Sequence, residues 1–143
     1  MTTSTFRGTY EHTLDDKGRI SLPAKFRKVL PKATLVLVPG PNGQLNLFTE
    51  EGFDEWIDSL LGEGSFESDA RKDQLVDFYY GDAENVDVDS AGRISISTTL
   101  RKRANLTDKV LVKGARSHIS LWSQAAWDRY MGDFDTRSAS YGQ

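Results

Sequence analysis

The chain contains an internal repeat, and this repeat constrains its fold more than any other feature. Residues 14–57 align with residues 88–131 at a constant offset of 74 positions without a gap, and 13 of these 44 positions are identical. Unrelated stretches of average composition would share about three identities. Self-similarity over this length indicates that one supersecondary unit occurs twice. We therefore predict two copies of one small module.

Each copy begins with the pattern of a tight turn. The sequences Asp-Asp-Lys-Gly at 15–18 and Asp-Ser-Ala-Gly at 89–92 both place Asp first and Gly fourth. A type I turn favours this arrangement, because the Asp carboxylate can accept a hydrogen bond from a nearby backbone N–H. We expect Asp15, Gly18, Asp89 and Gly92 to shape two hairpin tips. The alternating residues 19–22 and 93–96 predict a half-buried strand after each tip.

The remaining elements also recur in both halves. Residues 23–30 predict a short basic helix that starts at Pro23, and Ser97 or Thr98 can cap its counterpart in the second copy. Apolar runs at 35–38 and 45–48 flank a Pro- and Gly-rich turn, and residues 110–112 and 119–122 repeat this second hairpin. An amphipathic helix closes each half, and residues 69–80 predict a connecting helix before Gly81.

These elements predict a mainly β fold with short helices, in the α+β class. A module of about 45 residues with four short strands exposes strand edges and is close to the lower size limit for a stable core. Two modules with interlocked hairpins would cover those edges in one pseudo-two-fold, barrel-like protomer. We assign the repeats to residues 6–60 and 83–131, an acidic helical connector to 61–82 and a flexible tail to 132–143.

Charge is distributed unevenly along the chain. The net charge is −3, which is unusual for a protein that binds nucleic acid. Residues 13–32 nevertheless carry six basic and two acidic side chains, and residues 89–116 carry seven and two. Residues 50–87 carry two basic and thirteen acidic side chains. The sequence therefore predicts two basic modules joined by an acidic connector.

Several classes of function and location are disfavoured by what the sequence contains. The chain has no cysteine, its histidines His12 and His118 have no acidic or hydroxyl companions at catalytic spacing, and no glycine-rich phosphate loop occurs. We expect no enzyme activity, no metal site and no cofactor. Without an apolar run near 18 residues, we also expect no membrane span and a cytoplasmic location.

The repeated motifs resemble those of the MraZ family of bacterial transcriptional regulators, which has two SpoVT-AbrB, or swapped-hairpin, domains in one chain. The resemblance covers nearly the whole length. It rests on Phe-Arg-Gly-Thr-Tyr at 6–10, on Leu-Asp-Asp-Lys-Gly-Arg at 14–19 with Pro-Ala-Lys-Phe-Arg at 23–27, and on Val-Asp-Ser-Ala-Gly-Arg-Ile at 88–94 with Ile-Ser-Leu-Trp at 119–122. The D-x-x-x-R motif occurs twice, as it does in that family.

The resemblance implies a nucleoid-associated regulator that binds promoter direct repeats in double-stranded DNA. Members of the family form closed homo-oligomeric rings and repress their own division and cell-wall gene cluster. The family's DNA-contacting arginine falls on Arg19 and, in the second repeat, on Arg93. The candidate DNA-binding residues are Lys17, Arg19, Arg27, Lys28, Arg93, Arg101 and Lys102. Ala91 stands where the first repeat has Lys17, so we expect the first repeat to contribute more of the DNA contact.

Each candidate also has a purely structural interpretation. In this interpretation, Arg19 forms an ion pair with Asp15 that stiffens the turn and has no other role. The repeat and the local charge instead favour DNA contact by Arg19. Two interpretations remain open for the basic residues of the short helices, namely contact with phosphates and a solvated helix face. We interpret the aromatic residues Phe53, Trp56, Trp122, Trp127 and Tyr130 as core packing or a subunit contact rather than a platform for bases. An oligomeric scaffold that ignores DNA is the alternative function.

Overall fold

The computed structural model describes residues 5–62, 69–132 and 134, so most of the expected tail at 132–143 lies outside the described residues. The first repeat contains four strands and two helices: β1 (Thr9–Thr13), β2 (Arg19–Ser21), α1 (Ala24–Arg27), β3 (Leu35–Pro39), β4 (Leu45–Thr49) and α2 (Glu50–Leu61). The helix α3 (Asp69–Asp82) follows. The second repeat contains β5 (Glu84–Val86), β6 (Arg93–Ser95), α4 (Thr98–Arg103), β7 (Lys109–Gly114), β8 (Ile119–Trp122) and α5 (Gln124–Met131).

The strands form one six-stranded antiparallel sheet and a separate two-stranded ladder. The sheet order is β1-β7-β8-β4-β3-β5, and the ladder pairs β2 with β6. If each strand is replaced by its counterpart in the other repeat, the order becomes β5-β3-β4-β8-β7-β1, which is the same sheet read from its other edge. The two repeats are therefore related by a pseudo-two-fold axis, which passes between the equivalent residues Asn46 and Ser120 and between Ile20 and Ile94.

The repeats exchange strands rather than folding separately. The first strand of each repeat pairs with the third strand of the other, β1 with β7 and β5 with β3. The predicted α+β class is confirmed. The β1–β2 and β5–β6 segments interlock as predicted, but their strands pair with the other repeat and not with each other. Strand pairing in the described residues ends at β1 and β5, so closure of a barrel stays a prediction.

The main core lies between the sheet and the β2–β6 ladder. Its centre includes Ile20 and Ile94 from the ladder and Phe26 and Leu100 from α1 and α4, all at most 1% exposed. Alternation in β3 directs Leu35 and Leu37 into this core and their neighbours to the other face of the sheet. The core therefore needs residues from both repeats.

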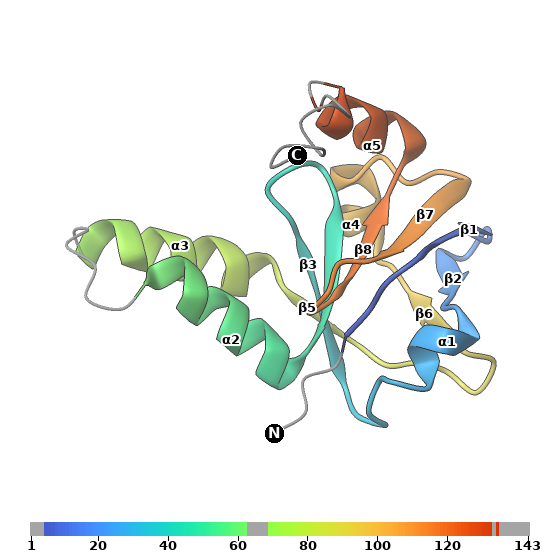
Figure 1. The fold of residues 1–143 in the computed structure, drawn as a ribbon, viewed down its shortest axis with the longest axis horizontal. Coiled ribbons are helices and arrows are strands. Elements are labelled where there is room, and N and C mark those ends of the chain that lie inside the picture. Colours follow the sequence, from blue (N-terminus) through green and yellow to red (C-terminus); the bar gives the residue numbers. More distant parts are fainter. Residues whose placement is uncertain (1–4, 63–68, 133, 135–143) are drawn as a thin grey trace, which may run out of the picture.

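A second apolar cluster lies on the opposite face of the sheet. The α2–α3 pair packs there on β3 and β4, with Phe53, Ile57 and Tyr79 against Val36 and Phe48. Figure 1 shows these two helices as an arm that projects on one side, while α1, β2 and β6 lie on the other. The acidic helices are thereby separated from the hairpin tips.

The helix ends follow local sequence rules. Ser97 caps α4, because its Oγ accepts a hydrogen bond from the backbone N–H of Leu100 at 3.2 Å. The helix α1 ends at Arg27, three residues before the predicted end at Leu30. Leu30 precedes Pro31, and the proline ring disfavours helical geometry at the residue before it. The connecting helix α3 continues through Gly81 to Asp82.

Candidate nucleic-acid interface

The first hairpin tip is held together by one carboxylate. Asp15 Oδ1 accepts hydrogen bonds from the backbone N–H groups of Lys17 at 2.9 Å and Arg19 at 2.8 Å. Asp15 Oδ2 accepts from Arg19 Nε at 2.8 Å, and the N–H of Gly18 donates to the carbonyl of Asp15 at 3.0 Å. The hydrogen bonds to its carboxylate, first among them the one from the Arg19 backbone, lower the pKa of Asp15 to about 2. Asp15 therefore fixes both the turn and the direction of the arginine.

The second tip repeats this geometry. Asp89 Oδ1 accepts from the backbone N–H groups of Ala91 and Arg93 at 2.9 Å, and Oδ2 accepts from Arg93 Nε at 3.0 Å. The same hydrogen bonds, led by that from the Arg93 backbone, lower the pKa of Asp89. The two motifs of the sequence are thus two copies of one three-dimensional turn.

The glycine of each tip joins the two repeats. Gly18 and Gly92 have φ values of +80° and +79°, which L side chains rarely adopt. The carbonyl of Gly92 accepts a hydrogen bond from the N–H of Leu22 at 2.9 Å, and that of Gly18 accepts from the N–H of Ile96 at 2.8 Å. Each tip is consequently attached to the strand of the other repeat.

The β2–β6 ladder brings the two signature arginines to one face. Arg19 lies opposite Ser95, and Arg93 lies opposite Ser21. Ile20 and Ile94 point into the core, so alternation directs Arg19 and Arg93 to the outer face of the ladder. Their side chains are 30% and 32% exposed. The structure therefore presents two oriented arginines on one face of the ladder, related by the pseudo-two-fold axis.

Arg27 and Arg101 lie against the tips of the opposite repeat. Arg27 Nε donates to the carbonyl of Leu22 at 3.1 Å, and a Cβ built on Gly92 would lie 2.6 Å from Arg27 Nη1. Arg101 Nε donates to the carbonyl of Ile96 at 3.0 Å, and its guanidinium carbon would lie 2.9 Å from a Cβ on Gly18. The glycines leave room for these side chains. The sequence did not indicate that Arg27 and Arg101 support the opposite tips, because this role depends on contacts between the repeats.

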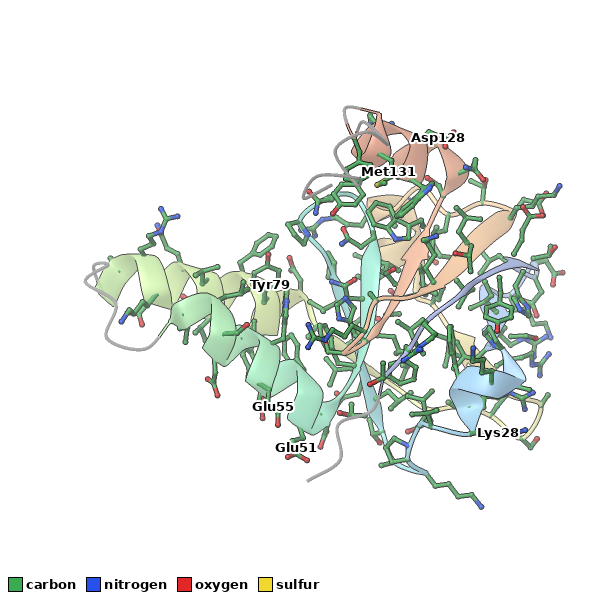
Figure 2. All side chains as sticks on the ribbon, viewed as in Figure 1. Lys28, Glu51, Glu55, Tyr79, Asp128 and Met131 are labelled. Atoms are coloured by element: carbon green, nitrogen blue, oxygen red, sulfur yellow. The ribbon has the colours of Figure 1, made fainter. Side chains whose placement is uncertain are left out.

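The lysines of the candidate set are all exposed. Lys17 lies at the first tip, Lys28 follows α1, and Lys102 lies in α4. Figure 2 shows Lys28 beside α1, on the other side of the view from Glu51 and Glu55 of α2. The separation of charge seen along the sequence is thus also a separation in space.

The described residues hold no group of three or more His, Asp or Glu side chains that could bind a metal ion. A cavity of about 710 Å³ is lined in part by Glu50, Glu51 and Glu55 of α2 and is therefore acidic. The arginine face, in contrast, is an exposed ladder rather than a cleft. Its geometry suits contact with an extended anionic surface.

Comparison with known proteins assigns the chain to a family. The family model described as the MraZ protein matches residues 5–76 and 79–140, so each of the two matches contains one repeat. The chain belongs to the MraZ family.

MraZ proteins from several bacteria are similar over most of this chain. The protein from Mesoplasma florum is 33% identical over 132 residues, which cover 92% of this chain and 89% of that protein. The proteins from Moorella thermoacetica and Kocuria rhizophila are 34% and 38% identical, covering 87% and 88% of this chain and 85% and 86% of theirs. Each is named transcriptional regulator MraZ.

Membership of the MraZ family confirms the predicted class of function. The family consists of transcriptional regulators, so this chain is a regulator of transcription rather than an enzyme. None of the helices in the described part of this MraZ chain is long and apolar enough to cross a membrane. The bounds that we assigned to the two repeats and the connector stay predictions, as do the DNA contacts of individual residues.

Proposed function

We propose that this MraZ-family regulator binds double-stranded DNA through the outer face of the β2–β6 ladder and the two hairpin tips. The observation that carries the proposal is the placement of Arg19 and Arg93 on the same outer face of the ladder, each oriented by an aspartate. A guanidinium held in this way can contact a guanine edge through two hydrogen bonds, or a phosphate. The exposed ion pairs contribute little stability of their own, which favours a role for the arginines in binding.

The two repeats contribute unequally in this proposal. The turns have the same hydrogen bonds, but the first carries Lys17 where the second carries Ala91. Lys17, Lys28 and Lys102 contact phosphates, which set the position of the protein on DNA without reading its sequence. Arg27 and Arg101 hold the opposite tip, and their charges add to the positive potential of this face.

The regulator acts as a homo-oligomer, a closed ring that places several ladders on promoter direct repeats. Several weak contacts then combine, and avidity can exceed the affinity of one site by about 10² to 10⁴. We propose that the cytoplasmic, nucleoid-associated protein represses its own division and cell-wall gene cluster in this way. A variant that stays monomeric would bind a fragment with three repeats no better than a fragment with one.

Footprinting on DNA upstream of its own gene tests the proposal. Loss of an arginine that contacts a base costs about 1–3 kcal/mol, so Arg19→Ala is expected to weaken binding about 5- to 150-fold. Arg93→Ala is expected to weaken it less. Each lost phosphate contact should also reduce the slope of log affinity against log salt by about 0.9.

Arg129→Ala is the matched control, because Arg129 is an exposed arginine of α5, away from the ladder. It should bind promoter DNA as the wild type does. Equal binding of promoter and random duplex by the wild type would contradict the proposal and support the oligomeric scaffold instead. An unchanged affinity of Arg19→Ala would contradict the assignment of the DNA contact to the ladder.

A further inference from the structure

A cavity of about 450 Å³ opens on the face of the six-stranded sheet that is turned away from the ladder. It lies between α2, which contributes Trp56, and α5, which contributes Trp127, Tyr130 and Met131. Met131 is labelled in Figure 2, beside α5. This volume is within the range of small-molecule sites, about 300–1,000 Å³. The cavity is not part of the proposed DNA-binding face.

The floor of the cavity contains a polar atom without a partner. Asn46 is 2% exposed and lines the cavity, and its Oδ1 accepts no hydrogen bond from any described residue. Buried polar atoms in folded proteins nearly always have a partner, because an unpaired one loses its bonds to water. The Asn46 side chain therefore requires an explanation that the fold does not supply.

Ser120 places a hydroxyl next to this acceptor. It lies directly opposite Asn46 in the β4–β8 pair, it is 5% exposed, and it also lines the cavity. Its Oγ accepts a hydrogen bond from Trp122 Nε1 at 3.0 Å, and a hydroxyl has one proton to donate in addition. The floor thus offers an acceptor and a donor side by side.

The walls of the cavity are aromatic. Trp122 is stacked on Tyr130 with ring centroids 4.9 Å apart, and Trp127 meets Trp122 edge to face at 5.2 Å. Trp56 contributes from the opposite side. Such rings favour a flat ligand that can stack on them.

The charge of the cavity argues against a cationic ligand. No Asp or Glu is among the described residues that line it. Lys113 Nζ lies 4.0 Å from the centre of the Trp127 ring and donates to Thr9 Oγ1 at 2.6 Å, so it is already engaged. Burial lowers the pKa of His118 to about 4, which leaves its imidazole neutral at neutral pH.

We propose that this cavity binds a small, uncharged, planar heteroaromatic compound that carries an N–H next to a ring C=O. Asn46 Oδ1 has less than 1 Å² of accessible surface, so the Asn46 side chain rotates on binding to bring Oδ1 to the cavity, where the ligand N–H donates to it. The ligand C=O accepts from the Ser120 hydroxyl. The ring lies among the tryptophans. Oxo-substituted purines and pyrimidines have this edge. The site goes beyond the proposed function, and its test does not depend on DNA binding.

Intrinsic fluorescence gives a direct test, because all three tryptophans of the chain line the cavity. Hypoxanthine, which has the required edge, is titrated into the full-length protein beside purine, which has the same bicyclic ring without the C=O. Hypoxanthine should quench the fluorescence saturably, with purine at least about tenfold weaker, as expected when buried polar groups lose their partners.

Asn46→Leu removes the unpaired acceptor and keeps a side chain of similar size. This variant should keep or raise the melting temperature of the ligand-free protein while losing hypoxanthine binding, a combination that a purely structural asparagine would not give. Ser120→Ala provides a second variant and should weaken binding at least about fivefold.

Equal quenching by hypoxanthine and purine, no saturable quenching at millimolar hypoxanthine, or unchanged binding by Asn46→Leu would overturn the proposal. The mass of the wild type and of Asn46→Leu in solution is measured in parallel by light scattering. A change in mass without any ligand effect would also overturn it, because the face would then be a contact between copies of the chain.

Discussion

Substituting the tip glycines tests whether the two repeats depend on each other as the contacts indicate. Gly18→Ala and Gly92→Ala introduce the same methyl group at φ values of +80° and +79°. The unfavourable φ costs about 1–2 kcal/mol at either position. Because this cost is the same at both positions, a difference in stability between the two variants must come from the atoms that the new Cβ meets in the opposite repeat.

The two sites differ in the atom that the methyl group meets. At Gly92 the nearest atoms belong to the Arg27 side chain, at 2.6–2.9 Å. The Arg27 side chain can rotate away, but it then loses its hydrogen bond to the Leu22 carbonyl. That bond contributes about 1 kcal/mol, so Gly92→Ala should destabilise the protein by about 2–3 kcal/mol. At Gly18 the nearest atom is the backbone oxygen of Ile96, at 2.8 Å. This oxygen belongs to the backbone directly after β6 and cannot rotate away, so Gly18→Ala should cost about 3–5 kcal/mol.

Urea denaturation followed by circular dichroism measures both values, with the slope checked for constancy. Combining Gly92→Ala with Arg27→Ala removes the clash, so the double variant should be about 1 kcal/mol more stable than the sum of the single effects predicts. Arg129→Ala in place of Arg27→Ala should give simple additivity. The argument would be refuted if Gly92→Ala were as damaging as Gly18→Ala, or if its combination with Arg27→Ala were additive.

Two further predictions concern pH and the core. His118 packs on Phe48 with ring centroids 4.6 Å apart, and burial lowers its pKa from 6.5 to about 4. The unfolded chain therefore binds a proton below pH 6.5 that the folded chain binds only near pH 4, so stability should fall by up to about 3 kcal/mol between pH 6.5 and 4. His118→Phe should flatten this part of a pH series of urea denaturation curves. Ile20 is 0% exposed, so Ile20→Ala should lower the free energy of unfolding by about 3 kcal/mol in the same assay. Val29 is 39% exposed, so Val29→Ala should lower it by less than about 1 kcal/mol. Equal losses of stability would contradict the placement of the core.

The polar contacts within each repeat follow from short stretches of sequence. The turn that begins at Asp15 depends on residues within four positions, and a carboxylate can find the N–H groups of such neighbours in any context that permits a turn. The same holds for Ser97 as a helix cap. Local chemistry of this kind is repeated whenever the sequence is repeated, so the two tips could be predicted together.

The sequence predicts that the two repeats contact each other, but it does not predict which residues make the contacts. Duplication and small module size predict interlocked hairpins, but they do not state that β1 pairs with β7 or that Arg27 lies against Gly92. Arg27 has the pattern of a solvated helix residue, because its partner is 65 positions away in the sequence. The tertiary structure alone reveals that this arginine contacts the opposite tip.

The sequence by itself determined the duplicated module, the turn chemistry of Asp15 and Asp89, and the uneven distribution of charge, because each depends on neighbouring residues or on their count. Only the tertiary structure decided that Arg19 and Arg93 share one face and that Asn46 meets Ser120 beneath a set of tryptophans. The physical reason is that both pairs form across the pseudo-two-fold axis. Strand exchange and burial of a shared core, rather than local preference, set which residues meet there.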